Sequence, residues 1–311
     1  MKTNFFAEYS RFEDGLIQKF HAHPLYQGFH ALPFAQFVNY VLQISFIAQN
    51  FVKWYETAKL GMVSESAREI IRHILRDEIP SSGATHQDDR LYDLMLMGIG
   101  TERVRNVRPS AGTQKTIKRL YQLIRYPQEN YDLRVLIALR VAGEVLVAEQ
   151  YRHIVEYMEH RLGISPEQSR FYAPHYEHDL KGVKSRESAG HADSFDVLLK
   201  EMISDQQTLE IAKATAQAAF EARSGIHDQF VRKLRSPKLI AGGLAAAITV
   251  ICILVFTNAG KPNWYNFLKS VDVQTRQFYL ECDRQLIERV ERSGNTEDLA
   301  KVGSLDRTSV V

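Results

Sequence analysis

Apolar and polar positions recur with helical periodicity along almost all of residues 1–235. In segments such as 34–60 and 130–162 the apolar residues return at intervals of three and four, which places them on one face of a helix. Few stretches alternate with the period of two that is typical of strands. Glycine and proline fall between the periodic segments, at Pro24, Gly61, 80–83, 98–100, 109–112, Pro127 and 163–166. The pattern predicts an all-α bundle of about seven helices.

One later segment is apolar without this periodicity. Residues 239–256 contain no charged side chain, and a helix needs about 20 apolar residues to cross a hydrocarbon core. A buried core helix is the alternative. Only Lys261 follows the segment closely, whereas a basic cluster precedes it: Arg232, Lys233, Arg235 and Lys238. Because positive residues stay on the cytoplasmic side of a membrane, we expect the N-terminal part to be cytoplasmic.

These patterns divide the chain into three parts. Residues 1–235 form the helical bundle, residues 236–260 contain a single transmembrane helix spanning 239–260, and residues 261–311 form a C-terminal tail that is partly helical. The first twenty residues contain acidic side chains where a secretory signal needs an unbroken apolar core, so we expect no cleaved signal. The sequence therefore predicts a single-pass membrane protein.

The composition of the chain argues against several classes of protein. The chain of 311 residues has 39 basic and 37 acidic side chains, a formal net charge of +2, which argues against a nucleic-acid-binding protein. Its two cysteines, Cys252 and Cys282, lie in no C-x-x-C pair, so a disulfide scaffold and a structural zinc site are not expected. Hydrophobic residues make up 45% of the chain, enough for a substantial core.

Glu78 and His86 flank a turn rich in proline, serine and glycine. Glu78 ends one predicted helix and His86 begins the next, so the turn lets both side chains point into the same space. The alternative is a solvated helix end, because Asp88 and Asp89 suit the first turn of a helix.

Glu144 lies in a run of valine, leucine and alanine. A carboxylate on such a helix is costly to bury unless it is paired, protonated or bound to a metal. Arg140, four residues earlier, is a possible ion-pair partner. A structural ion pair and a functional ligand both remain open for Glu144.

His175 and Asp179 stand four residues apart, so on a helix they project from one face and can reach one ion. His178 lies on an adjoining part of that face. A single pair of this kind is also common as a hydrogen-bonded surface pair. Mixed carboxylate and imidazole sets on separate helices, however, are how bundles hold two iron or manganese ions.

The order of these motifs resembles the haem-oxygenase-like di-iron oxidases and oxygenases, iron-containing redox enzymes that include the CADD-like proteins. The resemblance covers roughly residues 5–235, and residues 77–100 are its most characteristic block. In the family pattern the last histidine follows the aspartate by three positions, where this chain has Gly182; His191 is identified as the displaced ligand, with His178 in reserve. The resemblance thus implies the metal ligands Glu78, His86, Glu144, His175, Asp179 and His191.

The same resemblance implies a function. Two Fe ions, or Mn, would activate dioxygen to oxidise a small organic substrate that is fatty-acid-like or amino-acid-like, with an electron donor and, as one option, a homodimer. The alternatives are a membrane-anchored binding or interaction protein without turnover and a cofactorless bundle enzyme resembling the pyrroloquinoline quinone biosynthesis protein C. Haem binding through His21, His23 or His30 is a further alternative. Thiaminase II-like chemistry needs a cysteine in the bundle, and residues 1–235 contain none.

Overall fold

A computed structural model of the protein describes residues 4–78, 85–125, 128–179, 181 and 191–234. These residues are helical, and none of them forms a strand, which confirms the predicted all-α class. The elements are α1 (Phe5–His21), α2 (Pro24–Gln27), η1 (Phe29–Ala31), α3 (Phe34–Ala48), α4 (Phe51–Gly61), α5 (Glu65–Glu78), α6 (His86–Leu96), α7 (Thr101–Asn106), α8 (Ala111–Leu123), α9 (Tyr131–Leu139), η2 (Arg140–Val145), α10 (Leu146–Leu162), η3 (Pro166–Gln168), α11 (Tyr172–Asp179), α12 (His191–Ser194), α13 (Asp196–Met202), α14 (Gln206–Ser224) and α15 (Asp228–Leu234).

The described chain has more helices than the seven or so predicted, because some long periodic segments are interrupted. Segment 34–60 divides into α3 and α4 at Asn50. The Asn50 side-chain amide donates a hydrogen bond to the Phe46 carbonyl at 2.8 Å. Side chains of this type compete with the backbone for the bonds that continue a helix. Hydrophobic periodicity alone does not reveal such a break.

Within the described ranges, no helix has the length and apolar character needed to span a membrane. The predicted transmembrane segment 239–260 and the tail 261–311 lie outside the described residues.

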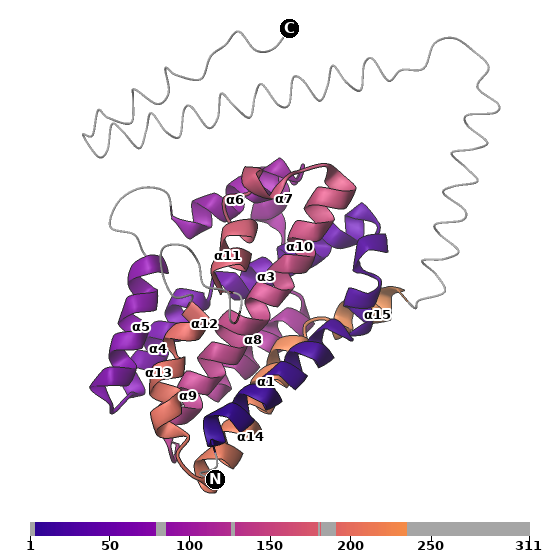
Figure 1. Ribbon diagram of the computed structural model, residues 1–311. Coiled ribbons are helices and arrows are strands. Elements are labelled where there is room, and N and C mark those ends of the chain that lie inside the picture. The colour runs from indigo at the N-terminus through magenta and orange to yellow at the C-terminus, as the bar shows by residue number, and fades with distance from the viewer. Residues whose placement is uncertain (1–3, 79–84, 126–127, 180, 182–190, 235–311) are drawn as a thin grey trace, which may run out of the picture. The chain divides into compact units, whose positions relative to one another are not determined.

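A continuous helix runs from α9 through η2 to α10 and forms the centre of the bundle (Figure 1). All residues from 135 to 151 are buried, so this helix is surrounded on every side, as its apolar sequence predicts. It ends at Gly163, whose φ of 68° is the left-handed conformation that favours glycine at a helix C-terminus. The helix predicted over 130–162 is thus present.

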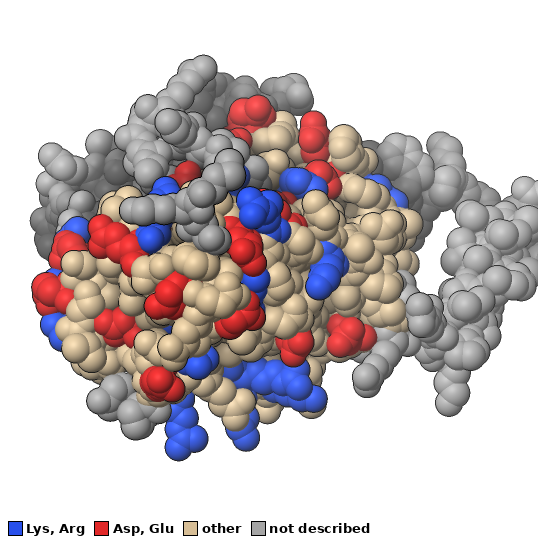
Figure 2. All heavy atoms as spheres, turned by 60° about the horizontal axis from the view of Figure 1, so that its bottom comes forward, with Lys and Arg blue, Asp and Glu red and all other residues tan. Residues whose placement is uncertain are grey.

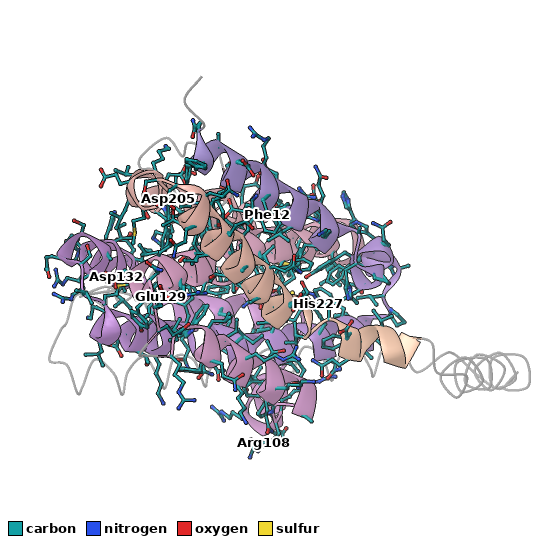
Figure 3. All side chains as sticks on the ribbon, turned by 90° about the horizontal axis from the view of Figure 1, so that it is seen from below. Phe12, Arg108, Glu129, Asp132, Asp205 and His227 are labelled. Carbon is teal, nitrogen blue, oxygen red and sulfur yellow. The ribbon has the colours of Figure 1, made fainter. Side chains whose placement is uncertain are left out.

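Two long helices cover this central helix. Helices α1 and α14 pack against each other, and α14 also contacts α9 and η2 (Figure 1). Figure 3 shows α14 running from Asp205 towards His227. Asp205 begins it by accepting a hydrogen bond from the Thr208 amide at 2.8 Å. On the face shown in Figure 2, acidic and basic side chains are interspersed.

A buried ion pair joins α1 to the centre. Arg140 in η2 is 1% exposed, and its Nε and Nη2 donate to the two carboxylate oxygens of Glu13 at 2.8 and 3.1 Å. Asp196 of α13 lies 2.8 Å from Arg140 Nη1, and Lys181 Nζ lies 3.0 Å from Glu13. Burial alone would raise the pKa of Glu13, but Arg140 and Lys181 outweigh burial and lower it. Such a bidentate ion pair fixes the orientation of α1 relative to the central helix.

We expect Glu13→Gln to lower the free energy of unfolding by about 3 kcal/mol, because it leaves the buried Arg140 guanidinium without its main counter-charge. Chemical denaturation of the full chain measures this change. Glu65→Gln is the matched control, since Glu65 pairs with Arg68 and Arg72 on the surface, and should leave stability unchanged. Equal effects of the two variants would contradict the structural role of the Glu13–Arg140 pair.

Candidate metal centre

The first candidate metal grouping consists of Glu78, His86 and His175, whose ligand atoms lie within 4.8 Å of one another. His86 Nδ1 is 2.9 Å from Glu78 Oε2 and 3.3 Å from His175 Nε2. Glu78 Oε1 is 4.0 Å from His175 Nε2. The three residues come from α5, α6 and α11, so the fold joins segments that are separate in the sequence.

Local structure explains how these side chains are aimed. Thr85 begins α6 through a capping box with Asp88, which sets His86 at the first helical position. His175 Nδ1 bonds to the Phe171 carbonyl at 2.7 Å, which leaves Nε2 directed at Glu78 and His86. Burial lowers the pKa of His175, so its imidazole is neutral at neutral pH, as a metal ligand must be.

The second grouping consists of His178, Asp179 and His191, again within 4.8 Å of one another. His178 Nδ1 lies 2.8 Å and His191 Nδ1 lies 3.3 Å from the same oxygen, Asp179 Oδ1. The structure therefore brings both candidates for the sixth position to Asp179. His191 is the more buried, with a side chain 7% exposed against 33% for His178, and it also approaches Glu144.

Glu144 lies in η2, a π-helical turn, and is 1% exposed. Tyr55 donates a short hydrogen bond to its Oε1, and its Oε2 is 3.6 Å from His191 Nδ1. The alternative of an ion pair with Arg140 is wrong, since Arg140 pairs with Glu13 and Asp196. A π turn inserts an extra residue into the helix, so residues four apart no longer share a face.

Gly143 makes the contact with Tyr55 possible. A Cβ atom at this position would lie 2.5 Å from the Tyr55 hydroxyl oxygen, closer than such atoms approach. The glycine next to Glu144 is thus a packing requirement for the tyrosine that holds the carboxylate.

The electrostatics centre on His191. Burial lowers its pKa, but Asp179 and Glu144 more than reverse this and raise it to about 12. Burial raises the pKa of Glu144. Burial also acts to raise the pKa of Asp179, but the neighbouring imidazoles of His178 and His191 lower it overall. One imidazolium therefore offsets part of the negative charge of two buried carboxylates.

The donor set fits a divalent metal ion. His191 Nδ1 is buried and makes no hydrogen bond of good geometry, although it faces oxygens of Asp179 and Glu144. Converging imidazole nitrogens and carboxylate oxygens suit iron, manganese or zinc. All six predicted ligands thus lie in or beside one of the two groupings.

The first grouping and part of the second line one cavity of about 260 Å³. The first grouping contributes all three of its residues to the lining, and the second contributes Asp179, with Glu144 beside it. Most of the remaining wall is apolar and comes from Ile47, Phe51, Val52, Trp54, Ile117 and Leu120. The cavity can therefore hold a small, partly apolar molecule next to the candidate metal ligands.

Sequence reasoning missed several residues of this site. Tyr55 gave no signal, because its partner lies 89 positions away. Asp77, 3.2 Å from His191 Nε2, adjoins Glu78 in the sequence and could have been considered for that reason. Two buried arginines of the cavity wall, Arg90 and Arg223, were also missed.

The histidines considered for haem lie elsewhere. His21 contacts His153 and Glu149 at 2.9 Å each, His23 lies 3.4 Å from Asp228, and His30 lies 3.6 Å from Glu156. None of the three lines the cavity described above.

No protein-family model and no curated protein matches the chain. Solved structures do: two crystal structures of a CADD-like protein of unknown function from Nostoc punctiforme. The first has a TM-score of 0.57 at 19% identity and covers 74% of this chain and 100% of that chain. The second has a TM-score of 0.55 at 18% identity and covers 73% and 96%. The expected resemblance to CADD-like proteins is thereby shown at the level of the fold.

Metal binding should release protons, because His191 carries a proton between Asp179 and Glu144 when no cation is present. We expect about one proton released per ion at the second grouping near neutral pH, and weaker binding as the pH falls. Calorimetry of Mn(II) binding to the full chain, in buffers of different ionisation enthalpy, measures the number. Binding without proton release would show that His191 is no ligand.

Proposed function

We propose that this protein is a metal-dependent oxidase or oxygenase that binds two iron ions and uses dioxygen to oxidise a small organic molecule. The observation that carries the proposal is that the whole first grouping and Asp179 of the second, with Glu144, line the same partly apolar cavity. The fold shared with CADD-like structures is compatible with this reading.

The residues for each ion follow from the distances. Glu78, His86 and His175 would hold one ion, and Asp179 and His191 would hold the other, with Glu144 beside them. Iron, when bound, supplies the redox chemistry with dioxygen that protein side chains lack. Manganese suits the same donors.

The chain itself positions these donors and shapes the cavity. Tyr55 fixes one oxygen of Glu144 and leaves the other facing His191. The Phe171 carbonyl sets the ring of His175. The apolar wall excludes water and binds the apolar part of a substrate. These are the contributions expected of a protein scaffold around a redox metal.

The decisive experiment is anaerobic reconstitution of the full chain with Fe(II), followed by iron analysis and measurement of oxygen consumption. We expect about two iron ions per chain. Glu144→Gln keeps the shape of the side chain but removes its charge, and should reduce oxygen consumption about tenfold or more. His191→Ala should lose one iron.

His160→Ala is the matched control, since His160 is exposed on α10 and away from the cavity; it should behave as the parent chain. Absence of bound iron in the parent would refute the proposal. Iron that binds without oxygen consumption would instead favour a binding protein without turnover. If His178→Ala loses iron and His191→Ala does not, the ligand is His178 in place of His191.

We also propose that residues 239–260 attach the protein to a membrane, with the bundle on the cytoplasmic side. The support is the uncharged run and the basic residues before it. Replacing Leu244 and Val250 by arginine should release the chain from alkali-washed membranes, because each charge costs about 2.5–3.5 kcal/mol in a spanning helix. A parent chain found in the supernatant would contradict the anchor.

A further inference from the structure

Arg223 of α14 is a buried cation without a buried anion. It is 4% exposed and lines the cavity that holds the candidate metal ligands. Its Nη2 donates to Gln150 Oε1 at 2.7 Å, and its buried Nε has no hydrogen-bond partner. Among the described residues, no carboxylate forms an ion pair with it. Burial lowers the pKa of Arg223, and the groups that oppose this are tyrosines.

Arg90 of α6 is in the same situation. It is 6% exposed and lines the same cavity. Nη1 donates to the Ser45 carbonyl at 3.1 Å, and the guanidinium lies 6.0 Å from the centre of the Phe171 ring. Within the described part of the chain, Arg90 also has no carboxylate partner. Two cations therefore line one cavity, and among the described residues neither forms an ion pair with the carboxylates of Glu78, Glu144 and Asp179 that line it too.

Tyr151 of α10 connects these two arginines. It lines the cavity as well. Burial raises the pKa of Tyr151 to about 12, and the charges of Arg223 and Arg90 both act to lower it. Both guanidinium groups thus lie close enough to one phenol to influence it. All three side chains line the same cavity, and Tyr151 and Arg90 both lie beside the Phe171 ring, at 5.5 and 6.0 Å from its centre.

Arg140 shows how a buried arginine with a structural role is neutralised in this fold. It is equally buried, yet it has Glu13 and Asp196 as partners at 2.8 Å. An unpaired guanidinium is costly to remove from water. Arg90 and Arg223 are buried without an ion-pair partner in a cavity wall, where a negatively charged ligand can pair with them.

The neighbouring wall indicates what the rest of the ligand is like. Phe51, Trp54 and Leu120 line it, and the Trp54 Nε1 donates to the Leu120 carbonyl at 3.0 Å. The polar atom of the indole is therefore already satisfied. This wall offers apolar contacts and requires no polar group from a ligand.

We propose that Arg90, Arg223 and Tyr151 form an anion-binding subsite that takes the carboxylate of a substrate whose apolar part packs against Phe51, Trp54 and Leu120. The inference rests on the proposed function in that it treats this cavity as the substrate site. A guanidinium matches the planar carboxylate through paired N–H donors. The subsite adjoins the first metal grouping, since the ring centres of Tyr151 and His175 lie 6.1 Å apart, but it consists of other residues.

The test is calorimetric binding to the full chain with no metal added, using octanoate, 1-octanol and inorganic phosphate as probes. We expect octanoate to bind at least about tenfold more tightly than 1-octanol, and phosphate to bind weakly, because only octanoate offers both the charge and the apolar part. Arg223→Met and Arg90→Met should each weaken octanoate binding about tenfold or more. Arg119→Met, on the exposed side of α8, is the control and should leave binding unchanged.

A second measurement distinguishes a role of Arg223 in ligand binding from a role in stability. Without ligand, Arg223→Met should melt at the same or a higher temperature than the parent, because it removes an unpaired buried charge. A lower melting temperature would assign Arg223 a structural role and overturn the inference. Equal binding of octanoate and 1-octanol, phosphate binding as tight as octanoate, or undiminished binding by both variants would also overturn it.

The comparison of octanoate with 1-octanol on the parent chain, together with Arg90→Met, decides the question if Arg223→Met does not fold. Failure of the anion-subsite inference can be distinguished from failure of the proposed function. Iron content and oxygen consumption test the metal groupings, whereas these measurements are made on the metal-free chain.

Discussion

Charge buried inside an apolar helical bundle is the constraint on which the rest of this structure depends. The central helix is buried throughout residues 135–151, yet it carries Arg140 and Glu144. Neither charge can reach water, so each must be balanced from another helix. Arg140 takes Glu13 from α1, and Glu144 faces His191 from α12. The ionic partners thus determine which helices must pack around the centre.

The π-helical turn separates these two roles. In a regular helix, residues four apart lie on the same face and would pair with each other. The inserted residue between Arg140 and Glu144 breaks that alignment, so one side chain joins the structural ion pair and the other joins the candidate metal centre. Such turns are often found at functional sites. A local irregularity of the backbone therefore allows one buried helix to carry both a structural ion pair and a candidate metal ligand.

The sequence predicted the helical class, the central helix and the residues gathered around the cavity, but for different reasons. Periodicity revealed the buried helix directly. Glu78 and His86 were expected to meet because of the turn between them, whereas His175 was added to them only through a resemblance, since no periodicity joins α11 to α5 and α6. The π turn and the contact of Tyr55 with Glu144 could not be predicted. Both depend on packing between segments 89 positions apart, which a single sequence does not encode in any local pattern.

The protonated His191 explains how the fold can bury the carboxylates of the candidate metal centre. Asp179 and Glu144 would repel each other in the interior, but the imidazolium between them supplies the positive charge that a metal ion would bring. Its one positive charge thus offsets part of the negative charge of the two carboxylates in the metal-free chain. The cavity wall at Arg90 and Arg223 has no such internal substitute among the described residues. The candidate metal ligands thus include a partial counter-charge of their own, whereas Arg90 and Arg223 have no ion-pair partner within the described part of the chain.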